Sequence, residues 1–339
     1  MRTSRREFVR WMGLGVTGTA LAHRRAAQAS QIRVLSGGPE EPALDFQRFV
    51  ASVRVGPGSG HDPLQVFWLS GPSAPPLTVT TLEEARARGD VVIVERDQAT
   101  VPELIVDNRG KSHVLLLAGE ILVGGKQNRV LMEDILLPPQ SGPRPLGVYC
   151  VEQARWAGRT KEFEARGSFA APGLRSQVLR KASQQRVWAE VDRYARSAAA
   201  PSATRDYQAI YDKPEVRAHL EEIKRRLDGP LAPGALGAAV FAAQTLVGLD
   251  LFFDPDLFAR EWPKLLHAHA LDGYRQLRPA DATEGGLRGR VEALLQAAGN
   301  AGGATRENVG VGHLLEYRVP GHWGAALVFD GRVVHAAIV

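Results

Sequence analysis

Residues 114–152 read VLLLAGEILVGGKQNRVLMEDILLPPQSGPRPLGVYCVE, and this stretch decides the fold class. Leucine-rich or β-branched runs lie at Val114–Val123, Val130–Leu137 and Leu146–Glu152, and glycine, proline or polar residues separate them. Short apolar runs bounded by such residues are typical of strands. The stretch therefore predicts consecutive strands of a sheet.

Similar runs extend this sheet towards the N-terminus, at Leu64–Leu69, Val91–Glu95 and Leu104–Asp107. The segment Ser30–Pro63 is rich in glycine and proline, so we expect short strands between loops there. These patterns together predict an N-terminal half that is mainly antiparallel sheet.

One helical pattern lies between the predicted strands, and further helical patterns follow them. Thr80 and Glu83 have the spacing of a capping box, which predicts a short helix that ends near Gly89. After Trp156 apolar residues recur at helical spacing among many charges. We expect four longer helices, at Leu174–Arg196, Pro214–Leu227, Leu257–Leu277 and Gly285–Ala298.

The remaining apolar segments predict strands. Gly234–Phe253 reads as a buried hairpin, and Asp330-Gly331 between two apolar runs is a strong signal for a two-residue hairpin turn. The expected class is α+β: a mainly antiparallel β N-terminal half, a helical middle section and a C-terminal β-hairpin, packed as one unit. We expect a single domain over residues 30–339, with a core at about 40–275 and a strand extension at about 305–339.

The N-terminus has the pattern of an export signal. Residues 4–10 read SRREFVR, a paired-arginine motif, and an apolar stretch of twelve residues follows at Trp11–Ala22. Ala27-Gln28-Ala29 supplies a cleavage site. We expect residues 1–29 to be a twin-arginine signal peptide, the twin-arginine translocase to be a partner during export, and the location to be periplasmic or secreted. A cytoplasmic protein with a basic N-terminal arm is the alternative.

Charge and cysteine content narrow the classes of partner. The predicted signal holds six arginines and one glutamate, which leaves 36 basic and 36 acidic residues in the remainder. A neutral balance argues against a nucleic acid or an anionic membrane as the main partner. Gln244, Thr245 and Asp250 interrupt the most apolar segment, so no stable membrane span is expected after cleavage. Cys150, the only cysteine, is expected to be a buried, inert thiol.

Motifs of common cofactor sites are misplaced or incomplete. Residues 13–18 match G-x-G-x-x-G, but they lie within the signal and no strand precedes them. A P-loop at Gly124-Gly125-Lys126 lacks its first glycine, and Gln127 replaces the serine or threonine. No H-E-x-x-H or cysteine pair is present, and the C-terminal histidines, among them His335, are expected to be structural. We therefore predict no metal site from motifs, and the cofactors stay unknown.

The candidate site consists of polar residues at the ends of apolar strands. Gly124 and Gly125 allow positive φ and close approach of a ligand to the backbone. The basic and amide side chains beside them suit an anionic ligand, and nearby carboxylates suit acid–base work or a metal. The residues are Glu120 and Glu152 as catalytic candidates, and Gly124, Gly125, Lys126, Gln127, Asn128, Arg129, Arg155 and Trp156 as ligand-binding candidates. The same groups suit an internal salt-bridge network equally well.

Two blocks carry a resemblance to a known family. Residues 119–129 (GEILVGGKQNR) and 148–156 (VYCVEQARW) resemble the ARG and rhodanese-phosphatase-superfamily-associated protein domain family. The similarity covers most of the chain after the signal, up to about Tyr274. It implies relatives associated with ADP-ribosylglycohydrolases, and hence a ligand related to ADP-ribose. It supplies no catalytic residues.

Two functions remain open from the sequence. The first is an exported soluble protein that binds or hydrolyses a small anionic nucleotide-like ligand related to ADP-ribose. In it, Lys126 and Arg129 hold the anion, and Glu120 or Glu152 acts as base. The second is a non-catalytic structural or interaction protein of the cell envelope, in which the polar blocks only stabilise the sheet.

Overall fold

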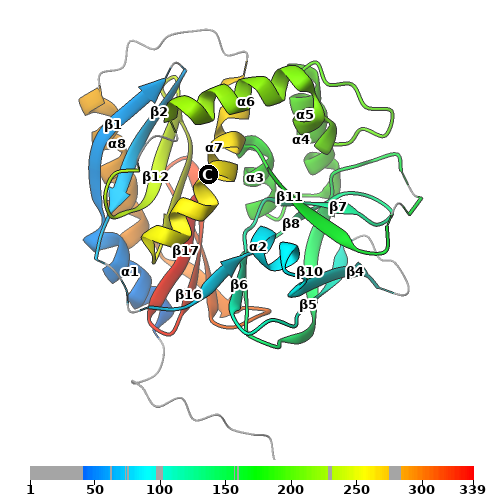
Figure 1. Cartoon of the computed structure of the whole chain (residues 1–339). Helices are drawn as coiled ribbons and strands as arrows, with labels where there is room; N and C mark the ends of the chain where they lie inside the picture. Colours follow the sequence, from blue (N-terminus) through cyan, green and yellow to red (C-terminus); the bar gives the residue numbers. More distant parts are fainter. Residues whose placement is uncertain are drawn as a thin grey trace, which may run out of the picture. The chain divides into compact units, whose positions relative to one another are not determined.

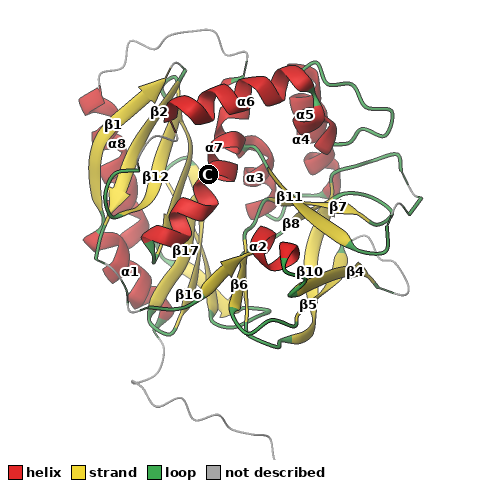
Figure 2. Ribbon diagram, viewed as in Figure 1, coloured by secondary structure: helices red, strands yellow, loops and turns green. Residues whose placement is uncertain are grey.

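Figure 1 shows the computed structural model, which describes residues 41–339 except 62, 73, 75, 97–101, 156, 159, 228–230 and 275–283. The predicted signal peptide and Trp156 lie outside the described residues. Antiparallel sheets and helices both contribute heavily, as the colouring in Figure 2 shows, so the predicted α+β class is confirmed.

The largest sheet joins the beginning of the described chain to its end. Its neighbouring strands are all antiparallel, and the predicted hairpins at Gly234–Phe253 and around Asp330-Gly331 both lie in it. The order is β1 (Arg54–His61), β2 (Leu64–Ser70), β12 (Ala235–Ala242), β13 (Thr245–Phe252), β17 (Arg332–Ile338), β16 (His322–Phe329), β15 (His313–Val319) and β14 (Gly303–Glu307).

Helices cover both faces of this sheet. On one face α1 (Pro42–Ser52) and α8 (Glu284–Gly299) pack on each other and on the strands. On the other face lies α7 (Pro255–Gly273), whose Trp262 packs edge-on against Trp68 of β2. Because side chains alternate along a strand, Phe67 faces the first layer and Trp68 the second.

A second sheet curls back on itself around a core of its own. An isolated antiparallel bridge between Val94 and Glu162 joins its two edges, and apolar side chains such as Leu122 and Phe163 fill the interior. Its order is β11 (Phe163–Phe169), β7 (Glu120–Gly124), β8 (Arg129–Leu131), β10 (Gly142–Cys150), β5 (Glu103–Asn108) and β4 (Val91–Glu95). A short third sheet comprises β3 (Val79–Thr81), β6 (His113–Leu116) and β9 (Ile135–Leu137).

Two of the predicted elements differ from those observed. The helix expected at Leu174–Arg196 is two helices, α3 (Pro172–Leu179) and α4 (Gln184–Ser197). Lys181 between them has φ of 52°, a left-handed conformation that ends α3. The side chain of Gln184 then pairs with both backbone groups of Cys150, which anchors α4 on β10.

The segment Ser30–Pro63 also differs, since it contains α1 where only strands and loops were expected. Phe46 and Val50, one helical turn apart, are buried in the same core, which explains why the segment is helical. The remaining helices are α5 (Gln208–Asp212), α6 (Pro214–Leu227) and α2 (Leu82–Ala87). None of the described helices combines the length and the apolar character of a transmembrane segment.

A shift of one residue at the start of α2 matters for the site. The capping box is formed by Thr81 and Glu84, whereas Thr80 and Glu83 were predicted to form it. The Glu84 carboxylate therefore accepts the hydrogen bond from the N-terminal backbone, and Glu83 faces α7.

Candidate functional site

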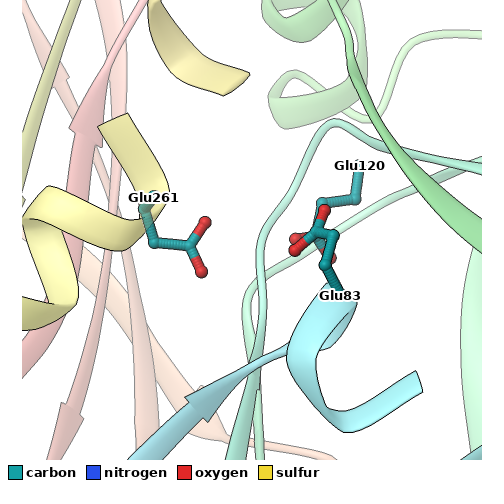
Figure 3. A group of neighbouring side chains, drawn as sticks. All are labelled: Glu83, Glu120 and Glu261. Atoms are coloured by element: carbon teal, nitrogen blue, oxygen red, sulfur yellow. The ribbon is translucent and has the colours of Figure 1, made fainter. Parts of the chain in front are cut away.

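Three glutamates from distant parts of the chain meet where α2, β7 and α7 come together. Glu83 lies on α2, Glu120 begins β7, and Glu261 lies on α7. One carboxylate oxygen of each lies within 4.8 Å of the others, and Figure 3 shows Glu261 pointing towards Glu120 and Glu83. With Lys264 they form what we call the acidic cluster.

Lys264 lies one turn after Glu261 and places its ammonium group among the three carboxylates. Its Nζ donates to Glu83 Oε2 at 2.9 Å and to Glu120 Oε1, and lies 2.6 Å from Glu261 Oε2. A further backbone contact fixes Glu120, whose Oε2 accepts a hydrogen bond from the Leu117 backbone at 3.2 Å. One ammonium group is thus shared by three carboxylates.

A tight turn aims Glu120 into this position. The predicted strand Val114–Val123 is interrupted at Ala118-Gly119, where the chain passes from β6 to β7. Gly119 has φ of 108°, and a Cβ there would lie 2.8 Å from Phe169. Only glycine suits both constraints, because L residues with a side chain rarely adopt this conformation.

The cluster is buried and its protonation is strongly perturbed. Glu120 and Glu261 are at most 1% exposed, whereas the Glu83 side chain is 30% exposed and provides contact with solvent. Burial raises the pKa of Glu120 well above its usual range and also raises the pKa of Glu261. Burial alone would lower the pKa of Lys264, but the surrounding carboxylates hold that pKa well above its ordinary value.

A second buried network contacts the backbone of Ala118, in the turn that precedes Glu120. His335 Nδ1 lies 2.6 Å from Asp134, and its Nε2 lies 3.1 Å from Asp250. Arg175 pairs with Asp250 at 2.7 Å and donates to the Ala118 carbonyl, while Asp134 accepts from the Ala118 backbone N–H. His335 is thus a partnered, fully buried histidine between two carboxylates, which suits the charged imidazolium.

The predicted glycine loop packs against its own chain. A Cβ on Gly124 would lie 2.6 Å from the Glu162 carbonyl, and one on Gly125 would lie 2.3 Å from the Phe163 ring. The absent side chains therefore make room for β11 beside the loop. Lys126, half-buried, donates its backbone N–H to Glu95 at 2.9 Å.

The polar residues after the loop form a hydrogen-bonded network with Glu152. Arg155 donates to both oxygens of Glu152, at 2.8 and 2.6 Å, and to the Gly125 carbonyl at 2.7 Å. Asn128 donates its backbone N–H to Glu152 and its side-chain amide to Asp206. Because Arg155 and two further hydrogen bonds outweigh the effect of burial, the pKa of Glu152 is lowered.

Arg129 and Gln127 also bond to groups inside the protein, although Arg129 Nε has no hydrogen-bond partner among the described residues. Arg129, 1% exposed, donates to the Gln127 carbonyl at 2.8 Å and lies 3.8 Å from Glu95. The Gln127 amide donates to the Gln153 carbonyl and accepts from the Cys150 thiol. Cys150 is buried as expected, and burial raises the pKa of its thiol.

The structure therefore divides the predicted site residues into two groups. Glu152 and Arg155 belong to the network at the loop, whereas Glu120 contacts Lys264 and the Leu117 backbone. The partners of Glu120 were missed from the sequence. Glu261 and Lys264 lie in a segment that was predicted to be helical, and they are three residues apart, on either side of Trp262. An acidic and a basic residue at this spacing were the only signal in the sequence.

The loop network predicts a large loss of stability when Arg155 is replaced. In Arg155→Met the buried Glu152 loses its partner, and the free energy of unfolding should fall by ~3–5 kcal/mol. The matched control is Arg166→Met, which removes an exposed pair with Glu164 and should cost less than ~1 kcal/mol. Urea denaturation measures both, and equal losses in the two variants would contradict the network.

His335 predicts a loss of stability at alkaline pH. Burial alone would lower its pKa, but Asp134 and Asp250 raise that pKa to about 9, above the ~6.5 of an unfolded chain. The charged His335 therefore adds up to roughly 3 kcal/mol to the free energy of unfolding. This contribution is complete below pH ~6.5 and is lost as the pH rises through about 9. Arg175, His269 and Glu261 also act on this network.

Denaturation curves between pH 6.5 and 9.5 measure this slope. His335→Gln should lower stability at neutral pH and reduce the slope. His113→Gln is the control, because burial shifts the pKa of His113 in the opposite direction, below its ordinary value. An unchanged slope in His335→Gln would refute the assignment.

Comparisons with known proteins identify a family. Searches of curated proteins and of solved structures each found no match. A family model matches residues 52–339, which includes the C-terminal strands as well as both blocks that carry the resemblance. The chain therefore belongs to the family of the ARG and Rhodanese-Phosphatase-superfamily-associated Protein domain.

Proposed function

We propose that this chain binds and hydrolyses a small anionic, nucleotide-like compound related to ADP-ribose, and that the acidic cluster is its reacting centre. The observation that supports this most directly is the convergence of three carboxylates and one ammonium group from three elements. Hydrolysis needs groups that hold water and groups that stabilise developing charge, and this cluster has both kinds. The family description, through its association with ARG proteins, supports the class of ligand.

The roles follow from exposure and contacts. Glu83 is the most exposed carboxylate and holds the attacking water. Lys264 donates to the oxygen on which negative charge develops, and Glu120 and Glu261 supply the negative charge that keeps this side chain at the site. The acidic cluster thus replaces the glycine loop as the proposed centre of the reaction.

Two arginines near the start of α2 suit the anionic part of the ligand. Arg260, on the same helix as Lys264, donates to Glu84 at 2.7 Å and to the Val79 carbonyl at 3.0 Å. Arg88 donates to Thr80 at 2.9 Å and is more than half exposed. Guanidinium groups bind phosphate in bidentate fashion, so this rim is the proposed phosphate-binding side.

The non-catalytic alternative draws its support from the glycine loop. Arg155, Glu152, Asn128 and Arg129 are buried and bonded within the chain, as a purely structural network requires. We propose that these residues stabilise the second sheet in either case. The two functions then differ only in whether the acidic cluster acts on a ligand.

Glu83→Gln is the sharpest test, because the partly exposed site tolerates the change better than a fully buried one. The purified chain is assayed for release of product from ADP-ribose, ADP-ribosylated peptide and other nucleotide-sugar compounds. The variant should reduce kcat by roughly 10²- to 10⁴-fold while the fold persists, since it loses the carboxylate that holds the water. Glu164→Gln, an exposed carboxylate of β11, is the control and should behave like the parent.

The outcomes of this assay separate the two functions. Turnover that Glu83→Gln abolishes and Glu164→Gln retains supports the hydrolase. No turnover of any compound by the parent chain favours the non-catalytic protein.

We also propose that the chain is exported by the twin-arginine route, on the basis of residues 4–29. Replacing Arg5 and Arg6 together by lysine should leave the uncleaved precursor in the cytoplasm, because the translocase reads this pair. Replacing Arg24 and Arg25 by lysine is the control and should not block export. Cell fractionation with immunoblotting measures both, and equal periplasmic amounts would contradict the proposal.

A further inference from the structure

The charge of the acidic cluster conflicts with an anionic ligand. Three carboxylates face one ammonium group, so the fully ionised cluster carries two negative charges in excess. Such an excess in a buried setting repels phosphate groups, and a buried charge is costly unless it is paired. A further cation of charge two would neutralise the site.

We propose that Glu83, Glu120 and Glu261 bind a divalent cation of the Mg²⁺ or Mn²⁺ type, which takes the place of the Lys264 ammonium group. Carboxylate oxygens are the ligands that such hard cations prefer. All three side chains already present an oxygen to a common point, with at most 4.8 Å between those oxygens. The substrate that the cation would bind rests on the proposed function, whereas the cation site itself rests on the geometry of the three carboxylates.

Glu261 is the independent observation that points to a ligand. It is 0% exposed, and within the described part of the chain its Oε1 has no hydrogen-bond partner. Its ion-pair contact among the described residues is with Lys264, 2.6 Å from Oε2. Figure 3 shows this carboxylate directed from α7 towards the other two.

Lys264 occupies the position that the cation would take. Its Nζ contacts each of the three carboxylates, with 2.9 Å to Glu83 Oε2 and 2.6 Å to Glu261 Oε2. An ammonium group and a metal ion therefore compete for the same oxygens. The side chain has four flexible carbons, so it can turn from the carboxylates towards the solvent-exposed side at Glu83 when a metal ion arrives.

The cation explains how an acidic site accepts an anion. The three carboxylates and one divalent ion together carry one negative charge, and the displaced Lys264 ammonium group on the Glu83 side brings the total to zero. Divalent ions of this class commonly bind through a few carboxylates together with substrate phosphates. The ion would thus link the cluster to the ligand, while Arg260, one turn before Lys264 on α7, lies beside Glu84 of α2.

Mn²⁺ binding to the full chain tests the inference without any substrate. Titration followed by electron paramagnetic resonance should show one saturable site. Lys264→Met, which keeps most of the length of the side chain and removes its charge, should bind Mn²⁺ at least tenfold more tightly. Glu261→Gln should bind at least tenfold more weakly, and Glu164→Gln should match the parent.

Several outcomes would overturn the inference. These are no saturable binding in both parent and Lys264→Met, equal affinity in Lys264→Met and parent, and unchanged affinity in Glu261→Gln. If Glu261→Gln does not fold, Glu83→Gln replaces it, because that side chain is partly exposed.

Hydrolysis is then measured with EDTA and with Mn²⁺. Full turnover in EDTA overturns the cation and leaves the hydrolase standing. Mn²⁺ binding without turnover of any compound supports the cation and counts against the hydrolase.

Discussion

The burial of Lys264 among three carboxylates is the constraint on which the arrangement around the site depends. Taking ions out of water costs several kcal/mol each unless partners compensate for the lost hydration. Here the partners come from α2, β7 and α7, so these elements are held in one relative position. Because α7 packs on the largest sheet and β7 belongs to the second sheet, the cluster also ties the two sheets together.

Charge balance distinguishes the buried networks from one another. At the glycine loop Arg155 is matched by Glu152, and the remaining hydrogen-bonding capacity of both is largely satisfied by backbone and amide groups. In the acidic cluster three carboxylates share one ammonium group, and among the described residues Glu261 Oε1 has no partner. Balanced pairs stabilise a fold at little further cost, whereas an unbalanced cluster persists where function requires it. This contrast is why we place the proposed chemistry at Glu83, Glu120 and Glu261.

Family membership and site geometry contribute different parts of the functional proposal. The family match covers residues 52–339 and supports the proposed class of ligand through the association of the family with ARG proteins. The contacts of Glu83, Lys264 and Arg260 support a particular location and a division of roles. Neither part depends on the glycine loop, whose space is filled by Phe163 and Glu162.

The sequence by itself determined the local elements and the family. Alternation and apolar runs predicted β2, β12 and β13, helical spacing predicted α6, and Asp330-Gly331 predicted the last hairpin. These features depend on neighbours along the chain, and the chain order shows them directly. The exact start of α2 and the break after α3 were missed, because the capping pair and Lys181 depend on which side chains find tertiary partners.

Only the tertiary structure decided the site. Glu120 was selected from its place at the end of an apolar run, but its partners Glu83, Glu261 and Lys264 lie on other elements. The tertiary structure also turned Arg129 and Arg155 inward, where the sequence allowed either a ligand or a salt bridge. Distances across the chain are set by how sheets and helices pack, and one sequence carries no local record of that packing.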